Sequence, residues 1–93
     1  MENEIITMKQ TVENIVKVIE ENLKEAYKII LKIGSTLIAV DYGLRKSQVH
    51  RVGDIVVIDI TEKELVINFR ASELEYIEIN GNHDKIVFFK SED

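Results

Sequence analysis

Apolar side chains recur at intervals of three and four residues early in the chain, and this spacing matches the 3.6-residue turn of a helix. Polar residues fall mainly on the opposite side, where Glu13 and Lys17 are spaced for an exposed ion pair. The pattern predicts an amphipathic helix over about residues 8–24, preceded by a frayed acidic start over residues 1–6. The helix is expected to begin near Thr7, where Gln10 completes a weak capping box, or near Thr11, where Glu13 lies at the positive end of the helix dipole. The apolar stripe of this helix consists of Val12, Ile15, Val16, Ile19 and Leu23.

Beyond this helix, the pattern changes to short runs of β-branched and aromatic residues separated by turn residues. Gly34-Ser35 is typical of a tight hairpin turn, and residues 80–84 (Asn-Gly-Asn-His-Asp) form a longer turn signal. Residues 44–51 are expected to form a polar loop. The apolar runs predict strands over about residues 26–33, 36–42, 54–60, 64–70, 74–79 and 85–90.

The segment 26–33 fits two interpretations. Its β-branched content and the turn that follows it favour a strand. Alternatively, Ala26, Ile30 and Ile33 continue the heptad-like spacing of the helical stripe, which would favour one long helix and helix-mediated dimerisation. The strand interpretation predicts that the helix breaks near residues 22–25.

The order of the elements indicates an α+β protein. Strands that follow one another so closely pair mostly in antiparallel fashion, because a parallel crossover needs a dozen or more residues. We therefore expect a single domain over residues 1–93, in which an N-terminal helix precedes a five- or six-stranded, mostly antiparallel sheet. This sheet curls or closes into a small barrel, and the helical stripe covers one face or one end of it.

The turn Val52-Gly53-Asp54 leads into the apolar run Ile55–Ile58, and Gly53 is expected to need a positive φ. In this turn, and in the order and spacing of its elements, the chain resembles SH3-like and Sm-like small barrels. The resemblance implies a fold only, since no functional motif of those families is found and no functional residue is carried over.

Composition narrows the function classes. The chain of 93 residues carries 17 acidic and 12 basic residues, and its net charge of −5 repels phosphate over the molecule as a whole. It has no cysteine, and no apolar run approaches the ~20 residues of a membrane span. The acidic start is unlike a signal peptide. We therefore expect a cytoplasmic protein that does not enter a membrane.

Motifs of common enzyme classes are missing. The glycines are isolated, so they form no phosphate loop, and His50 and His83 do not make a His-x-x-x-His metal motif. Residues 80–84 bring an aspartate, a histidine and two amides together, but a turn accounts for all of them. We expect no enzymatic activity, no metal and no cofactor.

A local excess of positive charge lies between Asp41 and Asp54, where no acidic residue occurs. One interpretation is an anion site in the loop 44–51, because arginine forks and a lysine ammonium bind phosphate oxygens. The other is a solvated loop whose basic side chains pair with nearby carboxylates. Nucleic acid is the less favoured ligand, since only Tyr42 adjoins the cluster as a stacking platform. The basic cluster consists of Arg45, Lys46, His50 and Arg51.

The predicted strands hold more apolar surface than one small core needs. The run Ile55–Ile58 is apolar on both faces, and the adjacent Phe88 and Phe89 point to opposite faces of a strand. Either the helix covers the second face, or part of that face is an interface that includes Ile30, Phe88 and Phe89. The sequence therefore favours a non-enzymatic binding or assembly module that contacts a protein partner or a second copy of itself. The alternative is a phosphate- or nucleic-acid-binding module that uses the basic loop.

Overall fold

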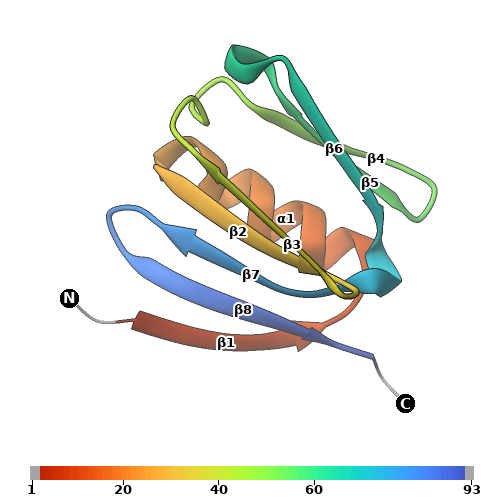
Figure 1. The fold of residues 1–93 in the computed structure, drawn as a ribbon. Coiled ribbons are helices and arrows are strands. Elements are labelled where there is room, and N and C mark those ends of the chain that lie inside the picture. The colour runs from red at the N-terminus through yellow and green to blue at the C-terminus, as the bar shows by residue number, and fades with distance from the viewer. Residues whose placement is uncertain (1–2, 92–93) are drawn as a thin grey trace.

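The computed structural model describes residues 3–91, which fold into one helix and eight strands in two sheets. One sheet has five strands in the order β1-β8-β7-β2-β3, and the other has three in the order β4-β5-β6 (Figure 1). Neighbouring strands are antiparallel except β1 and β8, which run parallel. The elements are β1 (Asn3–Lys9), α1 (Val12–Asn22), β2 (Lys28–Ile33), β3 (Thr36–Asp41), β4 (Gln48–Val52), β5 (Ile55–Ile60), β6 (Leu65–Arg70), β7 (Leu74–Asn80) and β8 (Asp84–Lys90), with 3₁₀ helices at Leu23–Glu25, Thr61–Lys63 and Ala71–Glu73.

Helix α1 begins where the sequence supplies a cap. The Asn14 backbone N–H donates to Thr11 Oγ1 at 3.1 Å, and Glu13 lies in the first turn near the positive end of the helix dipole. The α-helix ends at Asn22, and the following segment 28–33 is strand β2. The two interpretations of residues 26–33 are thus decided in favour of the strand.

The prediction for the start of the chain is wrong. Residues 3–9 form strand β1, so residues 3–6 are not a frayed start and the helix does not begin near Thr7. The alternative start is confirmed, since Thr11 is the N-cap and the helix begins at Val12. Residues 1 and 2 of that predicted segment lie outside the described residues. Ile6 and Met8 pack against the core, and the partner of β1 is the last strand of the chain. Local periodicity carries no information about a pairing over such a distance.

The predicted loop 44–51 also needs correction. Residues 48–52 form strand β4, which is antiparallel to β5. Val49 packs against the core and lies opposite the buried Ile58, whereas its neighbours in β4 are polar. A strand with one core contact and the polar residues Gln48, His50 and Arg51 lacks the alternating apolar pattern that identifies strands in a sequence.

The two sheets do not join into a barrel. Among the described strands, β3 is hydrogen-bonded only to β2 and β4 only to β5. The segment 42–47 therefore connects strands of different sheets. Of the two expected forms, a curled sheet or a small barrel, the closed barrel is therefore wrong, and eight described strands in two sheets replace the expected five or six in one. A likeness to SH3-like or Sm-like barrels is not confirmed. The α+β class and the mostly antiparallel pairing are confirmed.

One hydrophobic core joins the helix to both sheets. In Figure 1, α1 and the three-stranded sheet lie on the same side of the five-stranded sheet. The helical stripe packs into this core as predicted, although Val18 is buried and Val16 is only half-buried. The principal core residues are Ile15, Ile19 and Leu23 of the helical segment, Ile29, Leu31, Ile77, Ile79, Val87 and Phe89 of the five-stranded sheet, and Val56, Ile58, Ile60, Ile67 and Phe69 of the three-stranded sheet.

The turn between β4 and β5 depends on a glycine. Gly53 has φ +63°, so the predicted positive φ is confirmed. Apart from Gly53 and its two chain neighbours, no atom of the described residues lies within 4 Å of the place that a Cβ would occupy. The constraint at Gly53 is therefore conformational, because an L-residue disfavours this backbone region even where space is available.

The role of the helical stripe leads to a stability prediction. We expect Ile15→Ala, at a side chain that is 0% exposed, to lower the free energy of unfolding by about 2–5 kcal/mol. The same substitution at Ile5, which is 69% exposed, should cost less than about 1 kcal/mol. Urea denaturation of both variants measures the difference. Equal losses would contradict the assignment of the core.

Candidate functional site

The five-stranded sheet has a second face that no other element covers within residues 3–91. Side chains alternate between the two faces along each strand, so the residues between the core positions point away from the core. The adjacent Phe88 and Phe89 illustrate this, since Phe88 is exposed and Phe89 is buried. We call this surface the outer face, and its residues include Ile5, Thr7, Lys28, Ile30, Lys32, Leu37, Ala39, Asp41, Tyr76, Glu78, Ile86 and Phe88.

The strand register arranges most of the outer face in two rows that cross all five strands. Apolar residues predominate in both rows, and several are open to solvent: Ile5 is 69%, Leu37 59% and Phe88 36% exposed. The rings of Tyr76 and Phe88 lie with their centroids 5.6 Å apart, at a distance typical of favourable aromatic pairs. One row contains Ile5, Ile86, Glu78, Ile30 and Ala39, and the other contains Thr7, Phe88, Tyr76, Lys32 and Leu37.

A charged group on the outer face interacts with the chain itself. Lys32 Nζ lies 3.3 Å from Glu75 Oε2 and donates a hydrogen bond to the Gly34 carbonyl at 2.7 Å. The ammonium is therefore held toward the turn that joins β2 and β3. The outer face thus combines exposed apolar area with a few charged side chains, of which Lys32 is engaged by its own chain.

The structure separates the three predicted interface residues. Ile30 and Phe88 both lie on the outer face, where Ile30 is half-buried. Phe89 points to the other side of β8 and is 5% exposed in the core. It is therefore not available on the surface that Ile30 and Phe88 share.

The structure also divides the predicted basic cluster. His50 and Arg51 are consecutive in β4 and so point to opposite faces of the three-stranded sheet. Arg51 Nη1 lies 3.1 Å from Glu13 Oε2 of α1, and its Nε donates to the Gly53 carbonyl at 3.0 Å. Arg45 and Lys46 are exposed in the connection between β3 and β4. Arg51 is thus paired with a carboxylate, and the four basic groups do not converge.

Arg45 instead lines a hollow of about 540 Å³ that sequence reasoning missed. Two exposed tyrosines, Tyr27 and Tyr42, line the same hollow, and the Tyr42 backbone N–H donates to the Tyr27 carbonyl at 2.9 Å. Lys24 and Asn82 add polar groups, and the carboxylates of Glu25 and Glu62 also line it. The Gly34-Ser35 turn contained the signal, because the register of a hairpin closed there places Tyr27 opposite Tyr42.

A second hollow, of about 250 Å³, lies between the end of α1 and the start of β4. The buried Ser47 Oγ has no hydrogen-bond partner among the described residues and lines this hollow. Glu20 and Lys24 line it as well.

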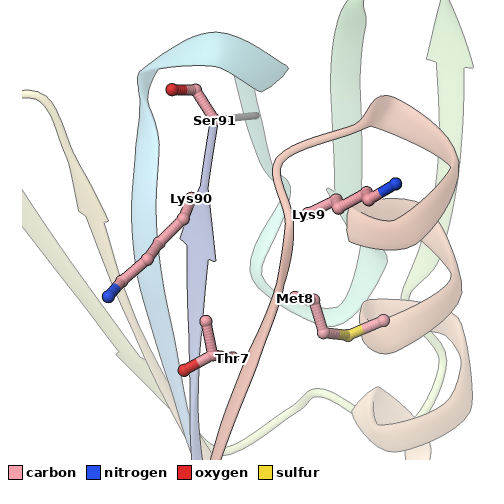
Figure 2. A pocket seen from close by; sticks show the side chains of 5 residues that line it. All are labelled: Thr7, Met8, Lys9, Lys90 and Ser91. Atoms are coloured by element: carbon pink, nitrogen blue, oxygen red, sulfur yellow. The ribbon is translucent and has the colours of Figure 1, made fainter. Parts of the chain in front are cut away.

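A third hollow lies where β1 and β8 end side by side (Figure 2). Figure 2 shows the side chains of Lys9 and Lys90 pointing in different directions, while Met8 points toward α1. The two ammonium groups therefore do not converge on one ligand position. The hollow measures about 650 Å³ and is also lined by Thr7 and Ser91.

Within the described part of the chain, no three histidine, aspartate or glutamate side chains group together in a way that would hold a metal ion. None of the helices described there has the length and apolar character that crossing a membrane requires. Comparisons with protein-family models, with curated proteins and with solved structures find no match. The candidate site is therefore identified from the geometry and composition of the protein's own surfaces.

The backbone at Tyr42 leads to a second stability prediction. Tyr42 has φ +65°, a region that costs a bulky residue about 1–2 kcal/mol, and its side chain is 73% exposed. We expect Tyr42→Gly to leave the free energy of unfolding unchanged or to raise it by up to about 1 kcal/mol. Thermal unfolding measures this, with Tyr27→Gly as the control at a tyrosine whose φ is not positive. A clear loss in Tyr42→Gly would show that the exposed ring stabilises the loop.

Proposed function

We propose that this protein is a non-enzymatic assembly module that packs the outer face of its five-stranded sheet against a protein surface, most simply the same face of a second copy. The observation that carries the proposal is the apolar composition of a sheet face that no other described element covers. A contact of this kind needs no catalytic group, which agrees with the lack of enzyme motifs in the sequence.

The composition of the outer face favours packing over solvation. A sheet with one solvated face normally alternates hydrophobic residues inward with polar residues outward. Here Ile5, Ile86 and Phe88 stand at outward positions of β1 and β8, and Ile30 and Leu37 at those of β2 and β3. Removing such side chains from water contributes about 25 cal/mol per Å², and two sheets pack face to face about 10 Å apart.

Substitutions on the outer face test this proposal. We expect Ile5→Lys and Phe88→Lys each to raise the dissociation constant of self-association at least tenfold, because each places an ammonium group in an apolar contact. Sedimentation equilibrium measures the constant. Val52→Lys is the matched control, since Val52 is 64% exposed and, like Ile5, lies in an edge strand, but belongs to the other sheet. Equal effects of Ile5→Lys and Val52→Lys would contradict a role of the outer face.

A second candidate function is the binding of phosphate groups or single-stranded nucleic acid at the Tyr27–Tyr42 hollow. The supporting observation is that two exposed aromatic rings line one hollow together with Arg45 and Lys24, since rings stack on bases and cations bind phosphate. The carboxylates that share the hollow and the net charge of −5 oppose it. This candidate therefore ranks second.

Fluorescence anisotropy with a labelled single-stranded oligonucleotide and with labelled tripolyphosphate tests the second candidate. If it holds, affinity falls steeply as salt is raised, and Arg45→Ala weakens binding several-fold. Arg51→Ala is the control within the same predicted cluster, and we expect it to have little effect because Arg51 is paired with Glu13. Binding that is absent, or that is equally sensitive to both substitutions, would exclude a site at this hollow.

A further inference from the structure

Strand β3 forms one edge of the five-stranded sheet and is hydrogen-bonded on only one side, to β2. No other backbone segment within residues 3–91 pairs with its free edge. Thr36, Leu37, Ala39 and Asp41 are exposed, so this edge is open to solvent. An open edge presents a row of unpaired N–H and C=O groups that a further strand can use.

The hairpin geometry identifies the unpaired groups. The Tyr42 N–H donates to the Tyr27 carbonyl at 2.9 Å, at the end of the β2–β3 ladder. In an antiparallel ladder every second residue directs its backbone groups to the same neighbour. Thr36, Ile38 and Val40 share the direction of Tyr42, so their backbone groups face β2. Leu37, Ala39 and Asp41 alternate with them, so their backbone groups face the free edge.

β3 also lacks the features that usually protect an edge strand. Proteins discourage edge pairing with charged side chains, proline or a β-bulge. The edge strand β1 contains Glu4 and Lys9, and the edge strand β4 contains Arg51. β3 pairs with β2 without a bulge and is uncharged until its last residue, Asp41. Among the other edges, β6 is also uncharged until its last residue, but Asn68 interrupts its apolar run.

We propose that a second copy of this chain pairs with β3 in antiparallel fashion across a two-fold axis, with Ala39 opposite the partner's Ala39. In this register Leu37 lies opposite the partner's Asp41. All three residues with free backbone groups then find hydrogen-bonding partners in the other copy. The inference rests on the proposed function in one respect, since it takes the chain to be an assembly module. The contact itself is different, because it joins two strand edges rather than two outer faces.

Charge and continuity favour a second copy as the occupant of this edge. With Ala39 on the axis, the two Asp41 carboxylates lie on opposite sides of it, about 14 Å apart along the strands, and no like charges face each other. Asp41 is also the residue opposite Lys28 within its own chain. Because Leu37 and Ala39 belong to the outer face, pairing joins the outer faces of both copies into one continuous apolar surface. Every copy presents the same edge, so the complementary strand is always present at the concentration of the protein.

Charge reversal at the axis tests the register. We expect Ala39→Lys and Ala39→Glu, each alone, to raise the dissociation constant of the dimer about fivefold or more, because like charges would face each other in the pair. An equimolar mixture of the two variants should restore association, since opposite charges then face each other. Sedimentation velocity measures both effects. Asn68→Lys, at an outward position of the edge strand β6, is the matched control and should leave association unchanged.

Amide hydrogen exchange gives an independent readout of the same contact. In the wild-type protein, the amides of Leu37, Ala39 and Asp41 should become protected as protein concentration rises, and in Ala39→Lys they should stay fast. Circular dichroism shows whether each variant is folded, which is expected because Ala39 is exposed.

The outcomes separate the edge contact from the outer-face contact. Association that is lost in Ala39→Lys and restored in the mixture, together with protection of the Leu37, Ala39 and Asp41 amides, supports edge pairing, even if Ile5→Lys has no effect and the outer-face proposal fails. The amide protection is needed because Ala39 also belongs to the outer face, whose packing would leave these backbone groups unpaired. Association that is lost in Ile5→Lys but is insensitive to both charges at Ala39 overturns edge pairing and leaves the outer face. A wild-type chain that stays monomeric at high concentration overturns self-pairing. The same result overturns it even if an extended strand of another protein is then found to pair with this edge.

Discussion

The structure depends on covering one face of a wide sheet with a short helix. Five strands spaced by about 4.8 Å span roughly 20 Å, whereas a helix with its side chains is about 10–12 Å across. Helix α1 alone therefore cannot bury the inner face that Ile29, Ile77 and Val87 provide. The three-stranded sheet completes the cover by adding its own inner residues, such as Ile58 and Phe69, to the same core.

Because the helix and the three-stranded sheet are both used to cover the inner face, the outer face of the five-stranded sheet is left exposed. Helix α1 and the three-stranded sheet both contribute to the core on the inner side, so neither covers Ile30, Phe88 and their neighbours on the outer face. The parallel docking of β1 beside β8 widens that face and adds Ile5 to it. The open edge at β3 has the same origin, because the chain leaves the sheet after β3 and begins a second one. The apolar outer face and the unpaired edge are thus two consequences of one architecture.

The direction of each strand position, rather than the order of charges in the sequence, decides which basic side chains lie close together. A run of basic residues looks continuous along the chain, but strand β4 directs His50 and Arg51 to opposite faces. Glu13 of α1 then meets Arg51, while Arg45 faces the two exposed tyrosines. An ion pair this exposed contributes little to stability, so its main consequence is that it engages the Arg51 guanidinium.

The sequence by itself determined the elements with a clear local period. The helical stripe from Val12 to Leu23, the six predicted strand segments and the divergence of Phe88 from Phe89 all follow from periods of 3.6 and 2 that neighbouring residues establish. The glycine turn at Gly53 was equally local. Part of the candidate site was predictable for the same reason, since Ile30 and Phe88 were identified as surplus apolar residues.

Only the tertiary structure decided the pairings between distant segments. The strand at residues 3–9 acquires its role from β8, and the strand at residues 48–52 acquires its role from β5, so neither carries a pattern that its own residues reveal. Pairings between distant segments also decided that the strands form two sheets rather than one barrel. They thereby decided which face of each strand is buried. The physical reason is that local spacing specifies which side chains share a face, whereas the free energy of burying that face depends on which distant segment packs against it.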